Sequence, residues 1–183
     1  TDSGPYVLPR SGTYTVEVVA GASDGDFLFR LLDLNASSVP ITIGTSYGQD
    51  FTAVSPYRAD VYRFTGGVGQ RVYVDQLESE YDVYGTVYRP SGQPLAGFSQ
   101  YNDMGPVTLD MPGAYYFILA NVNADSASDY LFRWLDAAQP PTATVPFDTT
   151  VSGASTNGNM VTLYRFAGSA GQRLFFDGSP TNA

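Results

Sequence analysis

Cysteine, histidine and lysine are all absent from this chain of 183 residues, and its nine basic residues are therefore all arginines. Without cysteine or histidine the chain has no disulfide framework, no Cys/His zinc site and no Ser-His-Asp or Cys-His catalytic apparatus. Without lysine it has neither a P-loop nor a Schiff-base residue. The side chains that remain for chemistry are carboxylates, hydroxyls, amides and guanidinium groups.

The chain has 18 acidic residues, a net charge of -9 and an isoelectric point near 4.1. This charge opposes phosphate backbones and anionic lipids, so we expect no nucleic-acid partner. No apolar run is long enough for a membrane helix, so we expect no membrane insertion. The residues are 43% hydrophobic and 14% aromatic, a composition that predicts a folded core.

Apolar residues occur in short runs rich in Tyr, Phe, Val and Thr, separated by Gly, Pro, Asn, Asp and Ser. This pattern is typical of short strands joined by turns, and no stretch shows helical periodicity. We predict an all-β fold, an antiparallel β-sandwich of jelly-roll type. The expected strands are Tyr14–Val19, Phe27–Leu32, Ile41–Thr45, Ala59–Thr65, Arg71–Val74, Val83–Tyr88, Tyr115–Ala120, Tyr130–Leu135, Thr162–Ala167 and Arg173–Asp177.

Three segments of the sequence recur in the same order. GDFLFRLLDL at 25–34 returns as SDYLFRWLDA at 128–137, an offset of 103 residues. VYRFTGGVGQRVYVD at 61–75 returns as LYRFAGSAGQRLFFD at 163–177, an offset of 102 with eight of fifteen residues identical. GPYVLPRSGTYTV at 4–16 returns as GPVTLDMPGAYYF at 105–117, an offset of 101. The pattern predicts a tandem repeat of about 102 residues in which each unit has its own core.

The phase of the repeat predicts how the chain is divided. Residues 39–138 are expected to form one complete sandwich, 1–38 the C-terminal half of a preceding unit and 139–183 the N-terminal half of a following unit. Neither half can bury its apolar face alone. Two arrangements complete the halves: they pair within the chain, or another copy completes them, head to tail, through β-strand complementation. The simpler alternative is that the two ends only mark where this piece was cut from a larger assembly.

One complete unit resembles a known family. Its order is DVYRF at 60–64, GQR at 69–71, DVYGTVYRPSG at 82–92, PGAYYF at 112–117 and DYLFR at 129–133. This order is similar to the bacterial pre-peptidase C-terminal domain family. The resemblance implies a β-sandwich of the kind that is appended to secreted proteases and repeated in large cell-surface proteins.

Acidic loops supply the candidate metal ligands. Two pairs of aspartates lie at equivalent places, just before the strand that recurs at 25–34 and 128–137. Carboxylate oxygens are ligands that calcium prefers. The alternative is that these residues form turns through bonds to the backbone, since neither loop has the spacing of an EF-hand. Calcium is the candidate metal, and no cofactor is expected to be required. The candidate ligands are Asp24, Asp26, Asp125, Asp129, Asp82 and Asp103.

Arg30 and Arg133 occupy equivalent positions inside otherwise apolar strands. If side chains alternate, Trp134 and the aromatic residues of its parity face the core, and both arginines face outwards. There the guanidinium groups are expected to meet carboxylates such as Asp33 and Asp136. The alternative is that the arginines bind a sugar acid or the carboxylates of a neighbouring unit.

Four tyrosines lie in segment 78–104, which has no second copy: Tyr81, Tyr84, Tyr88 and Tyr101. Exposed tyrosines can stack on sugar rings, but sandwich cores and tyrosine corners use the same residues. No carboxylate pair or nucleophile elbow of a hydrolase is recognisable, so no catalytic residue is predicted and the protein is expected not to be an enzyme.

These features predict a structural or adhesive repeat module of a long extracellular protein of the bacterial surface or of a filament. The expected partners are neighbouring copies of the same repeat and extracellular polysaccharide. The alternative is an accessory domain of a secreted hydrolase that binds a polysaccharide or protein substrate.

Overall fold

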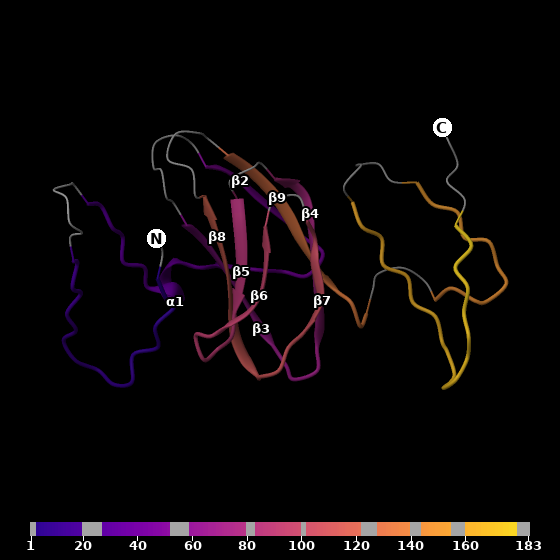
Figure 1. Cartoon of the computed structure of the whole chain (residues 1–183), viewed down its shortest axis with the longest axis horizontal. Coiled ribbons are helices and arrows are strands. Elements are labelled where there is room, and N and C mark those ends of the chain that lie inside the picture. The colour runs from indigo at the N-terminus through magenta and orange to yellow at the C-terminus, as the bar shows by residue number, and fades with distance from the viewer. Residues whose placement is uncertain are drawn as a thin grey trace.

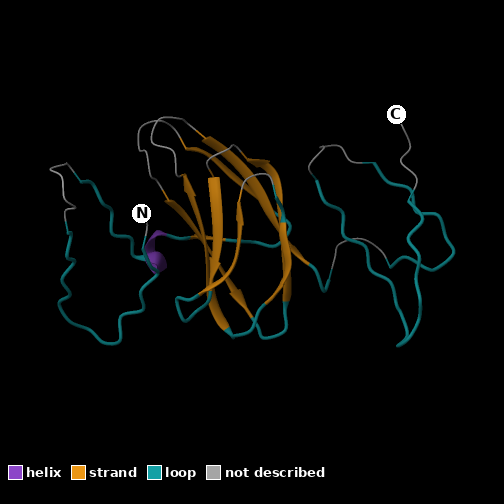
Figure 2. Ribbon diagram, viewed as in Figure 1, coloured by secondary structure: helices purple, strands orange, loops and turns teal. Residues whose placement is uncertain are grey.

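The computed structural model describes residues 3–19, 27–51, 59–79, 83–99, 102–121, 128–139, 144–154 and 160–178. A β-sandwich occupies the centre of the molecule, with the N-terminal segment on one side and the C-terminal segment on the other (Figure 1). The prediction of an all-β fold is confirmed, because strands make up the regular structure of the described residues apart from the short helix α1, Leu34–Ser37 (Figure 2).

The described residues form nine strands in two sheets. The order in the five-stranded sheet is β1-β3-β8-β5-β6, and in the four-stranded sheet it is β2-β9-β4-β7. Paired strands are antiparallel except for β1 and β3, which are parallel. The bounds are β1 Val39–Pro40, β2 Ser46–Phe51, β3 Ala59–Gly66, β4 Arg71–Ser79, β5 Val83–Tyr88, β6 Pro94–Ser99, β7 Met104–Thr108, β8 Gly113–Asn121 and β9 Ser128–Asp136.

The core lies between the two sheets and consists largely of aromatic side chains. On β9 the residues Tyr130, Phe132 and Trp134 are buried, which confirms the predicted core parity of this strand. The indole of Trp134 packs against Phe64 with ring centroids 4.4 Å apart and against Phe117 at 5.4 Å. These edge and tilted contacts join β9 of one sheet to β3 and β8 of the other.

The four strands expected in the flanking segments are not present there, so this part of the prediction is wrong. Tyr14–Val19, Phe27–Leu32, Thr162–Ala167 and Arg173–Asp177 carry no strand, and one isolated parallel bridge joins Thr144 to Arg165. A strand needs a hydrogen-bonded neighbour, and the two flanking segments lie on opposite sides of the sandwich (Figure 1). They therefore do not pair with each other.

The flanking segments nevertheless repeat hydrogen bonds that are found in the sandwich. The hydroxyl of Tyr115 donates to the carbonyl of Met111 at 2.8 Å, and that of Tyr14 donates to the carbonyl of Arg10 at 2.6 Å. Both bonds have the geometry of a tyrosine corner. The segments thus share local conformation with the sandwich although they lack its sheets.

A second local bond recurs in the turn that precedes β4 and in its counterpart near the C-terminus. Gly67 N–H donates to the side-chain oxygen of Gln70 at 3.2 Å, and Ser169 N–H donates to that of Gln172 at 3.0 Å. The same turn thus forms in the sandwich and in the C-terminal segment. The assignment of residues 1–38 and 139–183 to two further half-units stays a prediction.

Candidate functional site

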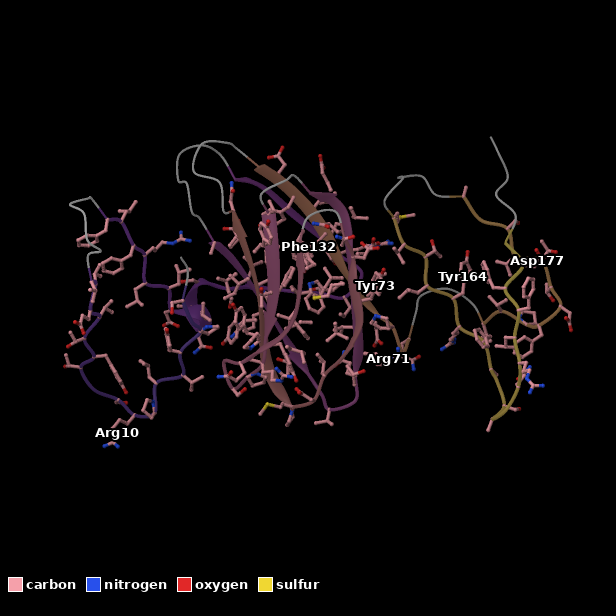
Figure 3. The ribbon with its side chains drawn as sticks, in the orientation of Figure 1. Arg10, Arg71, Tyr73, Phe132, Tyr164 and Asp177 are labelled. Atoms are coloured by element: carbon pink, nitrogen blue, oxygen red, sulfur yellow. The ribbon has the colours of Figure 1, made fainter. Side chains whose placement is uncertain are left out.

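A polar cluster lies on the outer face of the four-stranded sheet. Along β4, Val72 and Val74 point into the core, so Tyr73 and Asp75 point outwards (Figure 3 labels Tyr73). Asp75 stands directly opposite Arg133 of β9 in the register of the two strands. The predicted outward position of Arg133 is thereby confirmed.

Asp75 and Arg133 form a salt bridge that also holds the C-terminal segment. The Nε atom of Arg133 donates to Oδ2 of Asp75 at 2.6 Å, and its Nη2 atom donates to the carbonyl of Val161 at 2.6 Å. The backbone N–H of Val161 donates to both carboxylate oxygens of Asp75 at 3.2 Å. The side chain of Asp75 is 0% exposed, and these bonds offset part of the cost of burying its charge.

Asp103 occupies the end of this cluster that is nearest to β7. Its Oδ2 atom accepts a hydrogen bond from the hydroxyl of Tyr73 at 2.9 Å, and its Oδ1 atom accepts one from the backbone N–H of Gln76 at 2.8 Å. Both oxygens of the carboxylate are therefore used to hold the loop before β7 against β4.

Burial dominates the electrostatics of the cluster. Loss of hydration raises the pKa of Asp75 above its ordinary value, although the bonds from Arg133 and Val161 act in the opposite direction. Burial, followed by the hydrogen bond to Asp103 and the charge of that carboxylate, raises the pKa of Tyr73 to about 12. The tyrosine is thus kept as a neutral donor at every physiological pH.

Most of the predicted metal ligands lie outside the described residues: Asp24, Asp26, Asp82 and Asp125. Asp129 is described and lies on β9, where it stands opposite Asp50 of β2. Asp103 binds Tyr73 and Gln76, as shown above. Among the residues that the structure describes, no group of three or more acidic, histidine or cysteine residues is placed to hold a metal. Calcium binding stays a prediction.

The predicted carboxylate partners of the two repeated arginines are wrong. Asp33 accepts bonds from the N–H groups of Asn35 and Ala36 and begins helix α1, and Asp136 accepts bonds from the backbone after β9. Arg133 pairs with Asp75 instead, and Arg30 donates to the carbonyl of Ala59 at 2.7 Å. The acidic residues close to these arginines in the sequence accept hydrogen bonds from neighbouring backbone N–H groups. The arginines therefore bind partners that are distant in the sequence.

Sequence reasoning did not identify Asp75 or Val161 as site residues. A signal for Asp75 was present, because this residue and Asp177 are among the identical positions of the repeat. No signal singled out Val161, because the site contacts its backbone. Of the four candidate sugar-stacking tyrosines, Tyr84 and Tyr88 lie on β5 with their side chains partly exposed, and Tyr81 and Tyr101 lie outside the described residues.

A second feature is the exposed apolar surface of the flanking segments. Tyr14 is 46% exposed, whereas its counterpart in the repeat, Tyr115, is 0% exposed. Near the C-terminus Phe176 is 93% exposed, whereas its counterpart Val74 is 1% exposed. Positions that form the core of the sandwich are thus apolar in the flanking segments but remain uncovered.

The chain was compared with known proteins. No known family model matches it, and no curated protein matches it. The resemblance to the pre-peptidase C-terminal family therefore stays a prediction. Among the described residues, no helix has the length and apolar character needed to cross a membrane.

The solved structures that are similar include periplasmic inhibitors of g-type lysozyme. PliG of Aeromonas hydrophila is 14% identical with a TM-score of 0.42, and the match covers 54% of this chain and 96% of that chain. PliG of Salmonella Typhimurium is 19% identical with a TM-score of 0.42, covering 54% and 97%. A mutant of the Escherichia coli PliG is 18% identical with a TM-score of 0.38, covering 53% and 96%.

These comparisons overturn the functional prediction from the sequence. The matched proteins are described as inhibitors of an enzyme, which is neither a structural or adhesive repeat module nor an accessory domain of a hydrolase. The predicted partners, neighbouring copies of the repeat and extracellular polysaccharide, are wrong on the same finding, because the partner in those descriptions is g-type lysozyme. The prediction of head-to-tail assembly into filaments is wrong on the same finding.

Proposed function

We propose that this protein is a non-enzymatic protein-binding module that functions outside the cytoplasm. The observation that carries the proposal is the exposure of apolar side chains on the flanking segments at positions whose repeat counterparts are buried. Large apolar side chains exposed in such number mark a site of interaction with another macromolecule. The carboxylates of the outer-face cluster support a non-enzymatic role, because Asp75 and Asp103 are occupied in holding the backbone.

The partner that suits this surface is a polypeptide in an extended conformation. Residues 173–177 repeat the first residues of β4, and in the sandwich β4 lies between β9 and β7. By analogy, the ligand that covers residues 173–177 is an extended strand with alternating aromatic and aliphatic side chains, as in β9. The β9 strand of this chain is already paired with β2 and β4, and the partner that we propose is an extended segment of another protein, not a second copy of this chain.

A synthetic peptide with the sequence of 128–136, SDYLFRWLD, tests the proposal as a probe of the surface. We expect saturable binding to the full chain in isothermal titration calorimetry, with one site and a negative change in heat capacity. A negative heat-capacity change is the general mark of apolar burial. The same peptide with its residues in scrambled order should not bind.

Matched variants of the chain assign the binding to the flanking surface. Phe176→Asp is expected to abolish binding of the peptide, because it places a charge where an apolar contact is proposed. Val68→Asp changes an equally apolar residue that is 68% exposed in a turn of the sandwich, and it should leave binding unchanged. Absence of heat with the unmodified chain, or equal loss in both variants, would refute the proposed surface.

G-type lysozyme is a further probe for the same titration, since it is the enzyme named in the descriptions of the similar structures. Binding of this enzyme that Phe176→Asp abolishes would identify a natural class of partner. The proposed placement outside the cytoplasm rests on the periplasmic location of those inhibitors.

A further inference from the structure

The contact between the sandwich and Val161 has the geometry of a strand edge. Asp75 accepts the N–H of Val161, and Arg133 donates to the carbonyl of the same residue. In an extended chain the N–H and C=O of one residue point to the same side, and an antiparallel neighbour satisfies both. Here an acceptor and a donor on two side chains take the place of that neighbour. The pair binds backbone groups that every residue except proline possesses.

The arginine half of this contact recurs on the other side of the sandwich. Arg30 is the repeat counterpart of Arg133, and Ala59 is the counterpart of Val161. The Nη2 atom of Arg30 donates to the carbonyl of Ala59 at 2.7 Å, which matches the 2.6 Å bond from Arg133 to Val161. The contacted residues differ in side chain, alanine in one case and valine in the other. Recognition of the backbone explains why both are accepted.

The two contacts have the same direction along the chain. In each, the arginine lies in the segment that closes one repeat, and the carbonyl lies at the start of the strand β3 or of its counterpart in the next repeat. The contact at Val161 is the stronger of the two, because the buried carboxylate of Asp75 orients the guanidinium of Arg133 and also accepts the N–H of Val161.

We propose that Asp75 and Arg133 form a docking site for the backbone of one extended residue, and that this site fixes the position of the following repeat against the sandwich. The site does not read the side chain of the docked residue. It is independent of the proposed binding of a protein partner, because it lies on the outer face of β4 and β9 and not on the exposed apolar surface.

Distances between paired spin labels test this proposal directly, because the chain has no native cysteine. Val68→Cys and Ala170→Cys place the labels at equivalent, exposed positions: Val68 in the turn before β4, and Ala170 in the counterpart of that turn near the C-terminus. Pulsed electron paramagnetic resonance on the full chain should give one narrow distance distribution. Val161→Ala should retain it, because alanine keeps both backbone groups. Val161→Pro should broaden it at least about threefold, because proline removes the N–H that Asp75 accepts.

Arg133→Gln is expected to broaden the distribution as well, whereas Arg89→Gln, which removes the exposed pair with Asp110, should not. If Arg133→Gln prevents folding, Val161→Pro decides alone, since Val161 lies outside the two sheets. A narrow distribution that persists in Val161→Pro would overturn the proposal, and so would a broad one in the unmodified pair. Broadening in Val161→Ala equal to that in Val161→Pro would show that the side chain is recognised and would also overturn it.

Discussion

Asp75 shows how a single buried charge is tolerated in this protein. Its pKa is raised because burial removes the hydration of the carboxylate, and the bonds from Arg133 and Val161 offset only part of that cost. A raised pKa means that the folded chain keeps the proton to a higher pH than the unfolded chain. The stability contributed by this group is therefore greatest below its ordinary pKa of 3.8 and falls as the pH rises through the raised value.

Tyr73→Phe tests the electrostatics of the same cluster at alkaline pH. The variant loses the hydrogen bond to Asp103 and should be less stable by about 1 kcal/mol at neutral pH. The pKa of Tyr73 is raised from 10.0 to about 12, so its contribution is complete below pH 10.0 and is lost as the pH rises towards 12. Urea unfolding followed by circular dichroism should show that the stability difference between parent and variant shrinks over this range.

Tyr88→Phe is the control for the alkaline measurement. It removes the hydroxyl of a tyrosine on β5, in the other sheet, and thus controls for the loss of a phenol as such. A difference for Tyr73→Phe that stays constant up to pH 12 would contradict the assignment of the raised pKa to this tyrosine.

At the level of the strand, β5 depends on a glycine that faces the core. A Cβ atom on Gly85 would lie 2.4 Å from a ring atom of Phe98 and 2.8 Å from a ring atom of Phe117. Both rings belong to the packed interior, so neither can move away without disturbing its neighbours. The missing side chain thus lets β6 and β8 place aromatic rings over β5.

Gly85→Ala should therefore destabilise the sandwich by about 1–3 kcal/mol, the usual cost of overpacking a core. Gly67→Ala is the matched control, because a Cβ atom there meets nothing within 4 Å and the change should stay within about 0.5 kcal/mol. The midpoints of urea unfolding measure both. Equal midpoints for the two variants would show that the space over Gly85 is not filled as described.

Strands that carry their own apolar alternation were predictable from the sequence. Val83–Tyr88 was predicted with the bounds that β5 has, and the strands at β3, β8 and β9 were found to within a few residues. The strand at β4 was predicted only over its first four residues, and the missed strands are β1, β2, β6 and β7. The sequences of β2, β6 and β7, SYGQDF, PLAGFS and MGPVT, contain glycine, proline or several polar residues. Their strand conformation depends on the neighbours to which they bond. Residues 41–45 were expected as a strand but form the connection between β1 and β2.

The strands predicted in the flanking segments are absent from the described residues for the opposite reason, namely that the apolar pattern is present but a partner strand is not. Their apolar alternation equals that of the sandwich strands, but the pattern carries no information about whether a partner strand is present. The site was likewise predictable only in part. The outward direction of Arg133 followed from parity, whereas its partner Asp75 lies 58 residues away and depends on the register of β4 and β9.

On the scale of the whole molecule, the strands and the core fall within one continuous stretch of the chain. The described strands begin at Val39 and end at Asp136, and the core cluster draws its residues from between these limits. The stretch 39–138 therefore has the attributes of an independent folding unit.

Residues 39–138 produced alone should fold cooperatively. Trp134 is the single tryptophan and is 0% exposed, so its fluorescence reports directly on the core. We expect blue-shifted emission and one urea transition, with a stability within about 2 kcal/mol of the full chain, because removal of Val161 lets water reach Asp75 and Arg133. Red-shifted emission in the absence of urea would show that the core needs the flanking segments.

Two local bonds indicate the order in which such a unit folds: the tyrosine-corner bond of Tyr14 and the turn bond between Ser169 and Gln172. Both bonds form in the flanking segments, where no sheet surrounds them, so they need only a few consecutive residues. The pairing of β2 with β9, in contrast, joins residues 46–51 to residues 128–133, with strands β3 to β8 between them in the sequence. Loop-closure entropy makes such distant pairing slow. We expect local turns to form within microseconds and the joining of β2 to β9 to limit the rate of folding.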